Sequence, residues 1–347
     1  MDSRDRLLSI PRELRDEIIT LVLTHHHPSP QTTAEVEAQA RKNLWGDSVY
    51  YLADPGSYTA NAPALLLVNK QLRSETRSAL ERLDLAHEIE FKFVNEQYLA
   101  PTWTLIPTPT KHYKRVHASF QSMGAWHHPA LPSKFTGNPW KTGDGGPPTY
   151  VWIFYHTLGH FLTYGVDASR AEAPPGIVSV ERLELDFIDP KETHLLPPEN
   201  DSMTIWAARC RRSGSRRPRN PEGPELLRPE WLASDLTRYM HACFGMSYHF
   251  ARYARMLHGR IGTMVAKVNG NVIDDIDVGQ LLAELKFNNS FGNVDRAKRV
   301  ETWISWKEEA QEQRKKHGLK TVEFEDGWKE EARKRAAEYY EKNPSQW

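Results

Sequence analysis

Two stretches near the start of the chain place apolar residues at the spacing of a helix. The first helix is predicted over residues 7–23, with Pro11 in its first turn, where a missing N–H costs nothing. Its apolar stripe, at i, i+4, i+7 and i+8, is formed by Leu14, Ile18, Leu21 and Val22. The second helix is predicted over residues 64–83. Its stripe is formed by Leu65, Val68, Leu72, Thr76 and Ala79.

The residues between these helices, 28–63, are polar and are interrupted by proline and glycine. They are predicted to form mainly a loop, with one helical turn in the range 33–44. Together with the helices, this insertion makes up a predicted N-terminal region, residues 1–83.

Beyond residue 84 the apolar period shifts from that of a helix to that of a strand. Strands are predicted at 87–94, 116–120, 178–188, 263–268 and 272–276, the last two joined by Asn269-Gly270, a strong hairpin signal. Helices are predicted at 150–164, 230–257 and 278–287, although the aromatic content of the first leaves a strand open. Loops are predicted at 121–149 and 209–229. Residues 84–290 therefore form an irregular α/β body, with either a small sheet or a degenerate leucine-rich arrangement, because no regular period decides between them.

Residues 291–347 are highly charged and favour helix, which predicts a charged helical tail. The segment Trp306-Lys307-Glu308-Glu309-Ala310 recurs as Trp328-Lys329-Glu330-Glu331-Ala332. Two copies are too few for a repeat architecture. Two helices with solvated charged surfaces are expected. The overall expectation is an α+β fold with N-terminal helices, an α/β body and this tail.

Composition limits the class of protein. The length of 347 residues suits about two domains. Lys plus Arg and Asp plus Glu both number 45, so no overall field favours nucleic acid or an anionic membrane. Two cysteines indicate a reducing compartment. Charges interrupt the first apolar stretch and no run reaches the roughly 20 residues of a bilayer span. We expect an intracellular protein, in the cytoplasm, the nucleus or both.

Two motifs at the N-terminus carry a family resemblance. Ser9-Ile10-Pro11-Arg12-Glu13-Leu14-Arg15-Asp16-Glu17-Ile18-Ile19 is similar to the opening of an F-box. Leu66-Leu67-Val68-Asn69-Lys70-Gln71-Leu72-Arg73-Ser74-Glu75 resembles the later part, in the form seen in the fungal F-box-like family. The resemblance covers residues 7–83, and about forty residues separate the two halves where F-boxes normally have a short connection.

The resemblance implies a function in protein binding. In that family the F-box is a small helical module whose apolar face docks on the adaptor subunit of a cullin-type ubiquitin ligase. The docking positions that it implies are Ile10, Pro11, Leu14 and Ile18. Further positions, which complete either this surface or the core of the module, are Leu67, Val68 and Leu72. The remaining chain would hold an unknown target protein.

Other readings stay open. Both helices can instead bury their stripes against the body, because amphipathic helices usually serve core packing. An F-box-derived scaffold without a ligase is the second hypothesis, and the long insertion favours it. An enzyme with an unfamiliar site is the third, for which His156, His160 and Cys243 are the only hints.

The sequence offers little catalytic chemistry. His156 and His160 are four residues apart, as on one face of a zinc-binding helix, but no third ligand is evident and their neighbours are aromatic. They are predicted to be packed core histidines. Neither Cys210 nor Cys243 has a partner at zinc-finger spacing, and no nucleotide-binding or nucleophile motif is present. The prediction is a non-catalytic adaptor without metal or cofactor.

A basic strip interrupts the body between residues 209 and 219. Its centre is formed by Arg211, Arg212, Arg216 and Arg217. Such a strip is either a nuclear import signal or a solvated loop. It contains no aromatic platform or groove-reading helix, so specific nucleic-acid binding is not expected. No membrane partner is expected either.

Overall fold

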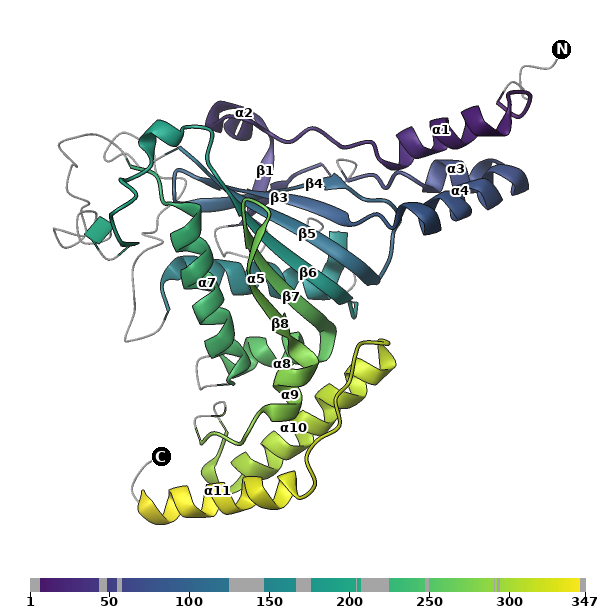
Figure 1. Ribbon diagram of the computed structural model, residues 1–347. Coiled ribbons are helices and arrows are strands. Elements are labelled where there is room, and N and C mark those ends of the chain that lie inside the picture. The colour runs from purple at the N-terminus through teal and green to yellow at the C-terminus, as the bar shows by residue number, and fades with distance from the viewer. Residues whose placement is uncertain are drawn as a thin grey trace.

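The computed structural model describes most of the chain, and its centre is a six-stranded sheet (Figure 1). The described residues are 7–43, 49–54, 58–124, 147–166, 176–203, 205–206, 225–246, 250–289, 291 and 294–343. The sheet has the order β4-β3-β5-β6-β7-β8. The strands are β3 His87–Val94, β4 Tyr98–Leu105, β5 His112–Met123, β6 Ser179–Ile188, β7 Ile261–Val268 and β8 Asn271–Asp277. The chain therefore has a mixed α+β fold, as predicted.

Neighbouring strands in the middle of the sheet are parallel. β3, β5, β6 and β7 run in one direction, and the outer strands β4 and β8 are antiparallel to their neighbours. Parallel neighbours need a crossover connection. Helix α5 (Thr149–Tyr164) lies between β5 and β6 in the sequence, and α7 (Pro229–Phe244) and α8 (Ala251–Arg260) lie between β6 and β7. A short 3-10 turn, Thr193–Leu195, follows β6.

One face of the sheet packs against these helices because its side chains are apolar. Phe120 of β5 stacks on Phe91 of β3 and on Phe187 of β6, with ring centroids 4.7 and 5.1 Å apart. Phe154 of α5 lies 5.8 Å from Phe120. Residues 150–164 are thus a buried helix, and the strand alternative is wrong.

The other face of the sheet carries charged side chains, as the two-residue period of a strand requires. Glu184 of β6 accepts hydrogen bonds from Lys267 and Arg182, each at 2.8 Å. Burial opposes the charged form of Glu184, but these hydrogen bonds outweigh it and lower its pKa to about 2. The charges around Glu184 are therefore mutually satisfied.

Residues 28–63 are more ordered than predicted. They contain α2 (Thr33–Ala38) and a small antiparallel pair, β1 (Arg41–Asn43) and β2 (Tyr50–Leu52). Arg41 donates to the carbonyl oxygen of Pro101 and to the hydroxyl of Thr102, both at 2.9 Å. The helical turn predicted in the range 33–44 is confirmed by α2. The predicted loop is wrong for β1 and β2, because this part of the segment packs along β4, a strand that was not predicted.

The predicted helix over 64–83 is two helices. Helix α3 covers Pro63–Val68 and α4 covers Lys70–Leu83. Between them Asn69 has extended backbone angles, φ −159° and ψ 174°, and its side chain accepts a hydrogen bond from the Leu72 N–H at 2.9 Å. An N-cap residue needs such a non-helical backbone, so Asn69 ends one helix and begins the next.

Of the two charged C-terminal helices, α10 is less solvated than its charge suggests. After α9 (Val278–Glu284) come α10 (Arg296–Lys316) and α11 (Trp328–Lys342). Helix α10 packs against α8, and its buried residues are Trp303, Ile304, Trp306, Lys307, Ala310, Gln311 and Arg314. The expectation of a solvated surface is wrong for the packed face of α10, whereas its other face and most of α11 are exposed.

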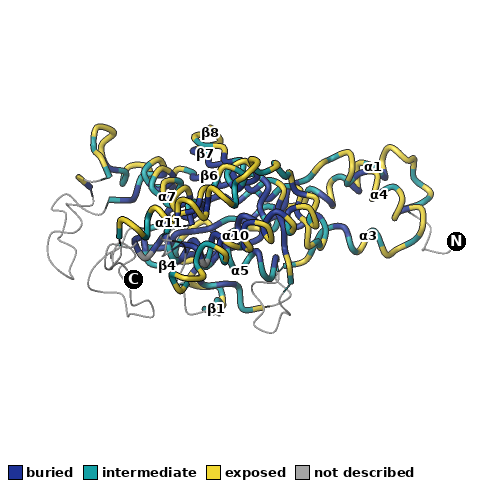
Figure 2. The backbone as a smooth tube through the Cα atoms, turned by 90° about the horizontal axis from the view of Figure 1, so that it is seen from below, coloured by how far each residue is buried: buried dark blue, intermediate teal, exposed yellow. Residues whose placement is uncertain are grey.

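The described residues contain three separate apolar cores, one of which packs α2 against β3, β4 and β5. The large core joins the sheet to α5, α7, α8, α10 and α11. A small one lies between α1 (Arg12–Leu23), α3 and α4, and its buried members are Ile19, Leu23, Ala62, Leu72 and Ala79. These three helices, called here the N-terminal module, project away from the sheet (Figures 1 and 2). Among the described helices, none is long and apolar enough to cross a membrane.

Candidate docking surface

A buried ion pair fixes how α1 lies on α4. Arg15 donates to both carboxylate oxygens of Glu75, at 3.1 and 2.7 Å, in a forked arrangement. The same guanidinium donates to the carbonyl oxygen of Ile10 at 2.6 Å, which ties down the segment before α1. The hydrogen bond from Arg15 is the main reason why the pKa of Glu75 is lowered. With this side of α1 turned inward, its neighbouring apolar stripe faces outward.

Large apolar side chains are exposed on two helices of this module. Their exposed fractions on α1 are 50% for Leu14, 38% for Ile18, 64% for Leu21 and 37% for Val22. On α3 they are 76% for Leu67 and 62% for Val68. These six, called here the N-terminal apolar surface, are the majority of the ten exposed large apolar side chains among the described residues. Such a concentration on a small module is typical of an interaction site.

The residues predicted for docking divide into two groups. Pro11, Leu14, Ile18, Leu67 and Val68 are exposed, and Ile10 is half-buried. Leu72 is only 1% exposed and belongs to the core of the module. Leu21 and Val22 were not among the predicted docking residues, although their i+7 and i+8 spacing from Leu14 places them on the same stripe.

Asn61, at the end of the long insertion, joins two helices of the N-terminal module. The Asn61 amide donates to three carbonyl oxygens at the end of α1, those of Val22, Leu23 and His25, at 3.1, 3.1 and 2.8 Å. The last carbonyls of a helix otherwise lack partners. Asn61 lies just before α3, so this contact joins the end of α1 to the start of α3.

Hydrogen bonds to the end of β4 hold the chain at the two places where it passes between the N-terminal module and the sheet. On the outward path, the His27 N–H donates to the Thr104 carbonyl at 2.8 Å. On the return path, the N–H groups of Asn61 and Ala62 donate to the carbonyls of Ile106 and Pro107, at 2.8 and 3.0 Å. The insertion is therefore bound to the end of β4 on both paths.

The histidines and the cysteine considered for catalysis lie in packed surroundings. His156 is 2.6 Å from the Tyr253 hydroxyl, and burial, followed by the charge of His156, lowers the pKa of His160 to about 4. Burial raises the pKa of the Cys243 thiol to about 12, so it is not a thiolate at neutral pH. In the described part of the chain, no group of three or more His, Cys, Asp or Glu is arranged to hold a metal.

Cys210 and the basic strip Arg211, Arg212, Arg216 and Arg217 lie outside the described residues. No family model, no curated protein and no solved structure matches this chain. The feature that bears most directly on function is therefore the N-terminal apolar surface.

Proposed function

We propose that this chain is a non-catalytic, F-box-like adaptor. Its N-terminal apolar surface docks on the adaptor subunit of a cullin-type ubiquitin ligase, and its α/β body holds a target protein. One observation carries the proposal: α1 and α3 expose large apolar side chains while the module has a complete small core of its own. The exposed stripe is thus not required for folding, which supports a role in binding.

The energetics suit a protein interface. Burying one exposed leucine contributes about 1.5 kcal/mol or more, so Leu14, Leu21 and Leu67 together supply several kcal/mol. Exposed charged residues, Glu13 and Glu17, flank the stripe on α1. An apolar centre with a polar rim is the usual anatomy of such an interface.

The α/β body gives less specific support to the proposed binding of a target protein. Its parallel strands β3, β5, β6 and β7 are neighbours in the order of the sequence, as in a leucine-rich arrangement. The connections differ from one crossover to the next, because β4 connects β3 to β5 and helices connect the others. We infer a single irregular α/β body that presents a target-binding surface.

The test is a binding measurement between the purified full-length chain and the ligase adaptor subunit. The Leu14→Ser/Leu67→Ser variant removes one apolar anchor from each exposed helix. The matched control, Ser78→Ala/Glu81→Ala, changes exposed residues of α4, the third helix of the module, without removing a large apolar side chain. We expect the wild type and the control to bind equally well, and the Leu14→Ser/Leu67→Ser variant to bind at least tenfold more weakly.

Absence of binding by the intact, folded chain would contradict the ligase role and leave the F-box-derived scaffold as the better account. Deleting residues 28–63 is a poor alternative test. It would remove Arg41 from the Pro101 carbonyl and Asn61 from the end of α1, and so disturb β4 and the module together.

A further inference from the structure

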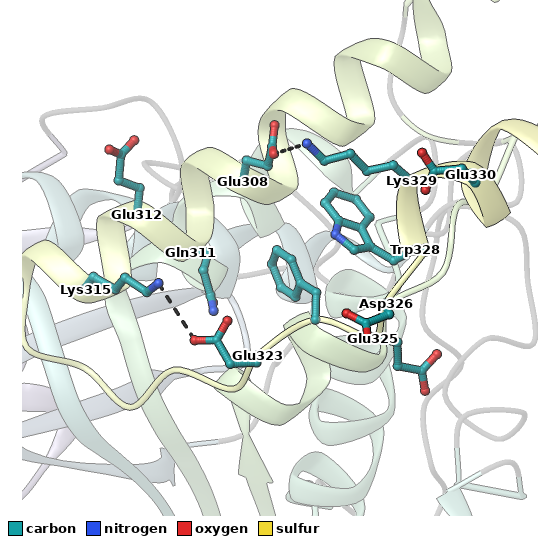
Figure 3. Close-up of a pocket in the computed structure, with 12 residues that line it drawn as sticks. Glu308, Gln311, Glu312, Lys315, Glu323, Glu325, Asp326, Trp328, Lys329 and Glu330 are labelled. Atoms are coloured by element: carbon teal, nitrogen blue, oxygen red, sulfur yellow. Dashed lines mark ion pairs between the residues drawn. The ribbon is translucent and has the colours of Figure 1, made fainter.

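A second site lies far from the N-terminal module (Figure 1), between α10, α11 and the segment that joins them (Figure 3). It is an open groove of about 590 Å³. Its lining includes six acidic residues: Glu308, Glu312, Glu323, Glu325, Asp326 and Glu330. Only two basic residues line it, Lys315 and Lys329. This acidic groove shares no residue with the N-terminal apolar surface, so an inference about it does not depend on ligase docking.

The negative charge of the acidic groove is only partly neutralised. Glu308 pairs with Lys329, and Glu323 lies 3.9 Å from Lys315. Among the described residues, Glu312, Glu325 and Asp326 form no ion pair. A chain of zero formal net charge thus concentrates uncompensated carboxylates at one place, which favours a cationic ligand.

Aromatic rings form one wall of the groove, and they already attract cations. The ammonium group of Lys307 lies 4.6 Å from the ring centre of Phe324 and 5.0 Å from that of Trp328. The ammonium group of Lys329 lies 5.7 Å from the Trp328 ring. Both rings remain half-buried, so part of each faces the groove. Ring faces of this kind stabilise lysine and, more often, arginine.

A buried side chain in the wall points to the kind of group that binds there. Gln311 is only 7% exposed and extends from α10 toward Glu323 (Figure 3). Its amide nitrogen donates to the Val322 carbonyl at 2.9 Å, whereas its oxygen Oε1 accepts no hydrogen bond from any described residue. An unsatisfied buried acceptor is costly. A ligand with N–H donors would satisfy it.

We infer that the acidic groove binds an arginine-bearing peptide segment of another protein. A guanidinium group is planar, stacks on aromatic rings and donates through several N–H groups in a fork. It can therefore stack on the Trp328 ring and pair with a free carboxylate such as Asp326, and its further N–H groups are the kind of donor that the Gln311 oxygen lacks. An ammonium group should bind more weakly, because it neither stacks flat on a ring nor forms a forked pair with a carboxylate.

The experiment measures the binding of short fluorescent peptides to the full-length protein. The probes are a peptide of alternating arginine and glycine, the same peptide with lysine, and the same peptide with glutamate. We expect the arginine peptide to bind most tightly, the lysine peptide more weakly and the glutamate peptide not at all. The affinity should fall as salt is added, because the carboxylates are exposed.

Two variants locate the site. Glu312→Gln/Asp326→Asn removes two free carboxylates of the groove and should weaken binding of the arginine peptide about tenfold. Glu81→Gln/Glu341→Gln removes two exposed carboxylates elsewhere and should leave the affinity unchanged. Gln311→Met keeps the length of the side chain and should also weaken binding. If the Gln311→Met variant does not fold, the Glu312→Gln/Asp326→Asn variant decides the result.

Equal weakening by the two double variants would show attraction to net charge alone and overturn the inference. So would a lysine peptide that binds as tightly as the arginine peptide, or an arginine peptide that does not bind at low salt. None of these results bears on whether α1 and α3 bind the ligase adaptor.

Discussion

The N-terminal module and helix α10 reverse the usual relation between residue type and burial. Helix α1 leaves Leu14 and Leu21 exposed and buries Arg15. Helix α10 is highly charged, yet Lys307 and Arg314 are among its most deeply buried residues, at 1% and 0% exposure. The comparison shows that the partners available at a position decide burial more than the side chain alone.

The partners of the two buried cations of α10 are backbone carbonyl groups. Arg314 donates to the carbonyls of His258, Ile261 and Lys320, at 2.8, 2.7 and 2.9 Å. Lys307 donates to the carbonyls of Ala283 and Leu285, at 2.9 and 2.8 Å. Burial lowers the pKa of Lys307 to about 8 and that of Arg314 to about 10, so both remain mainly charged at pH 7.

The largest effect should come from removing the most buried cation. Arg314→Leu leaves three carbonyl groups without their donor and should lower the free energy of unfolding by about 3–5 kcal/mol. Arg335→Leu, on the exposed side of α11, should change it by less than about 0.5 kcal/mol. Urea unfolding of both variants measures the difference. Similar losses of unfolding free energy in the Arg314→Leu and Arg335→Leu variants would mean that the buried cation of α10 contributes no more to stability than an exposed one.

Acid should destabilise the packing of α8 against α10, because His258 of α8 is fully buried. Burial lowers the pKa of His258 from 6.5 to about 4. The unfolded chain therefore binds more protons between these values, and stability falls as the pH drops from 6.5 toward 4, by up to about 3 kcal/mol. Unfolding free energies across this range should show that His258→Gln is less sensitive to pH than the wild type. An equally steep loss in the variant would assign the effect to other groups.

A smaller effect is expected for Lys307→Met, which keeps the apolar stem but removes the charge. The two carbonyl bonds are lost, so the cost should be about 1–2 kcal/mol at pH 7. The wild type has a second signature: the lowered pKa of Lys307 means that stability rises between pH 8 and 10.5. Unfolding in alkaline buffers should show this rise in the wild type and not in the variant.

The smallest effect on stability should come from the exposed leucines. Leu14→Ser and Leu67→Ser should each change the free energy of unfolding by about 0.5 kcal/mol or less. Leu72→Ala in the core of the same module should cost about 2–4 kcal/mol. Chemical unfolding separates these values. A large cost for Leu14→Ser would mean that the stripe serves folding and would weaken the docking proposal.

Much of the sheet could be predicted because its strands alternate or follow strong turn signals. The strands near 87–94 and 178–188 are present, and Asn269 and Gly270 form the turn of the β7–β8 hairpin with positive φ angles of 48° and 78°. Strand β4 was missed because it contains Pro101 and does not alternate, since all eight of its residues are buried. The break at Asn69 was missed because the apolar stripe continues across it.

The two sites differ in how far the sequence revealed them. The apolar stripe of α1 was predicted from helical spacing, and the F-box resemblance assigned docking to part of it, although Leu21 and Val22 of the same stripe were not among the docking positions. The acidic groove was not predicted at all. A run of charges looks alike in the sequence whether it is solvated or packed, and only the fold brings Gln311 next to Glu323 and Trp328.

The hydrogen bonds of the insertion to the end of β4 also determine how the molecule responds to force. A pull on α1 is passed through His27 to Thr104, and a pull on α3 through Asn61 to Ile106. The covalent link from α4 to β3 makes a third attachment. Force applied to the module is thus divided between the end of β4 and the start of β3, which are paired. It does not fall on a single flexible hinge. Whatever binds the module therefore pulls directly on the sheet.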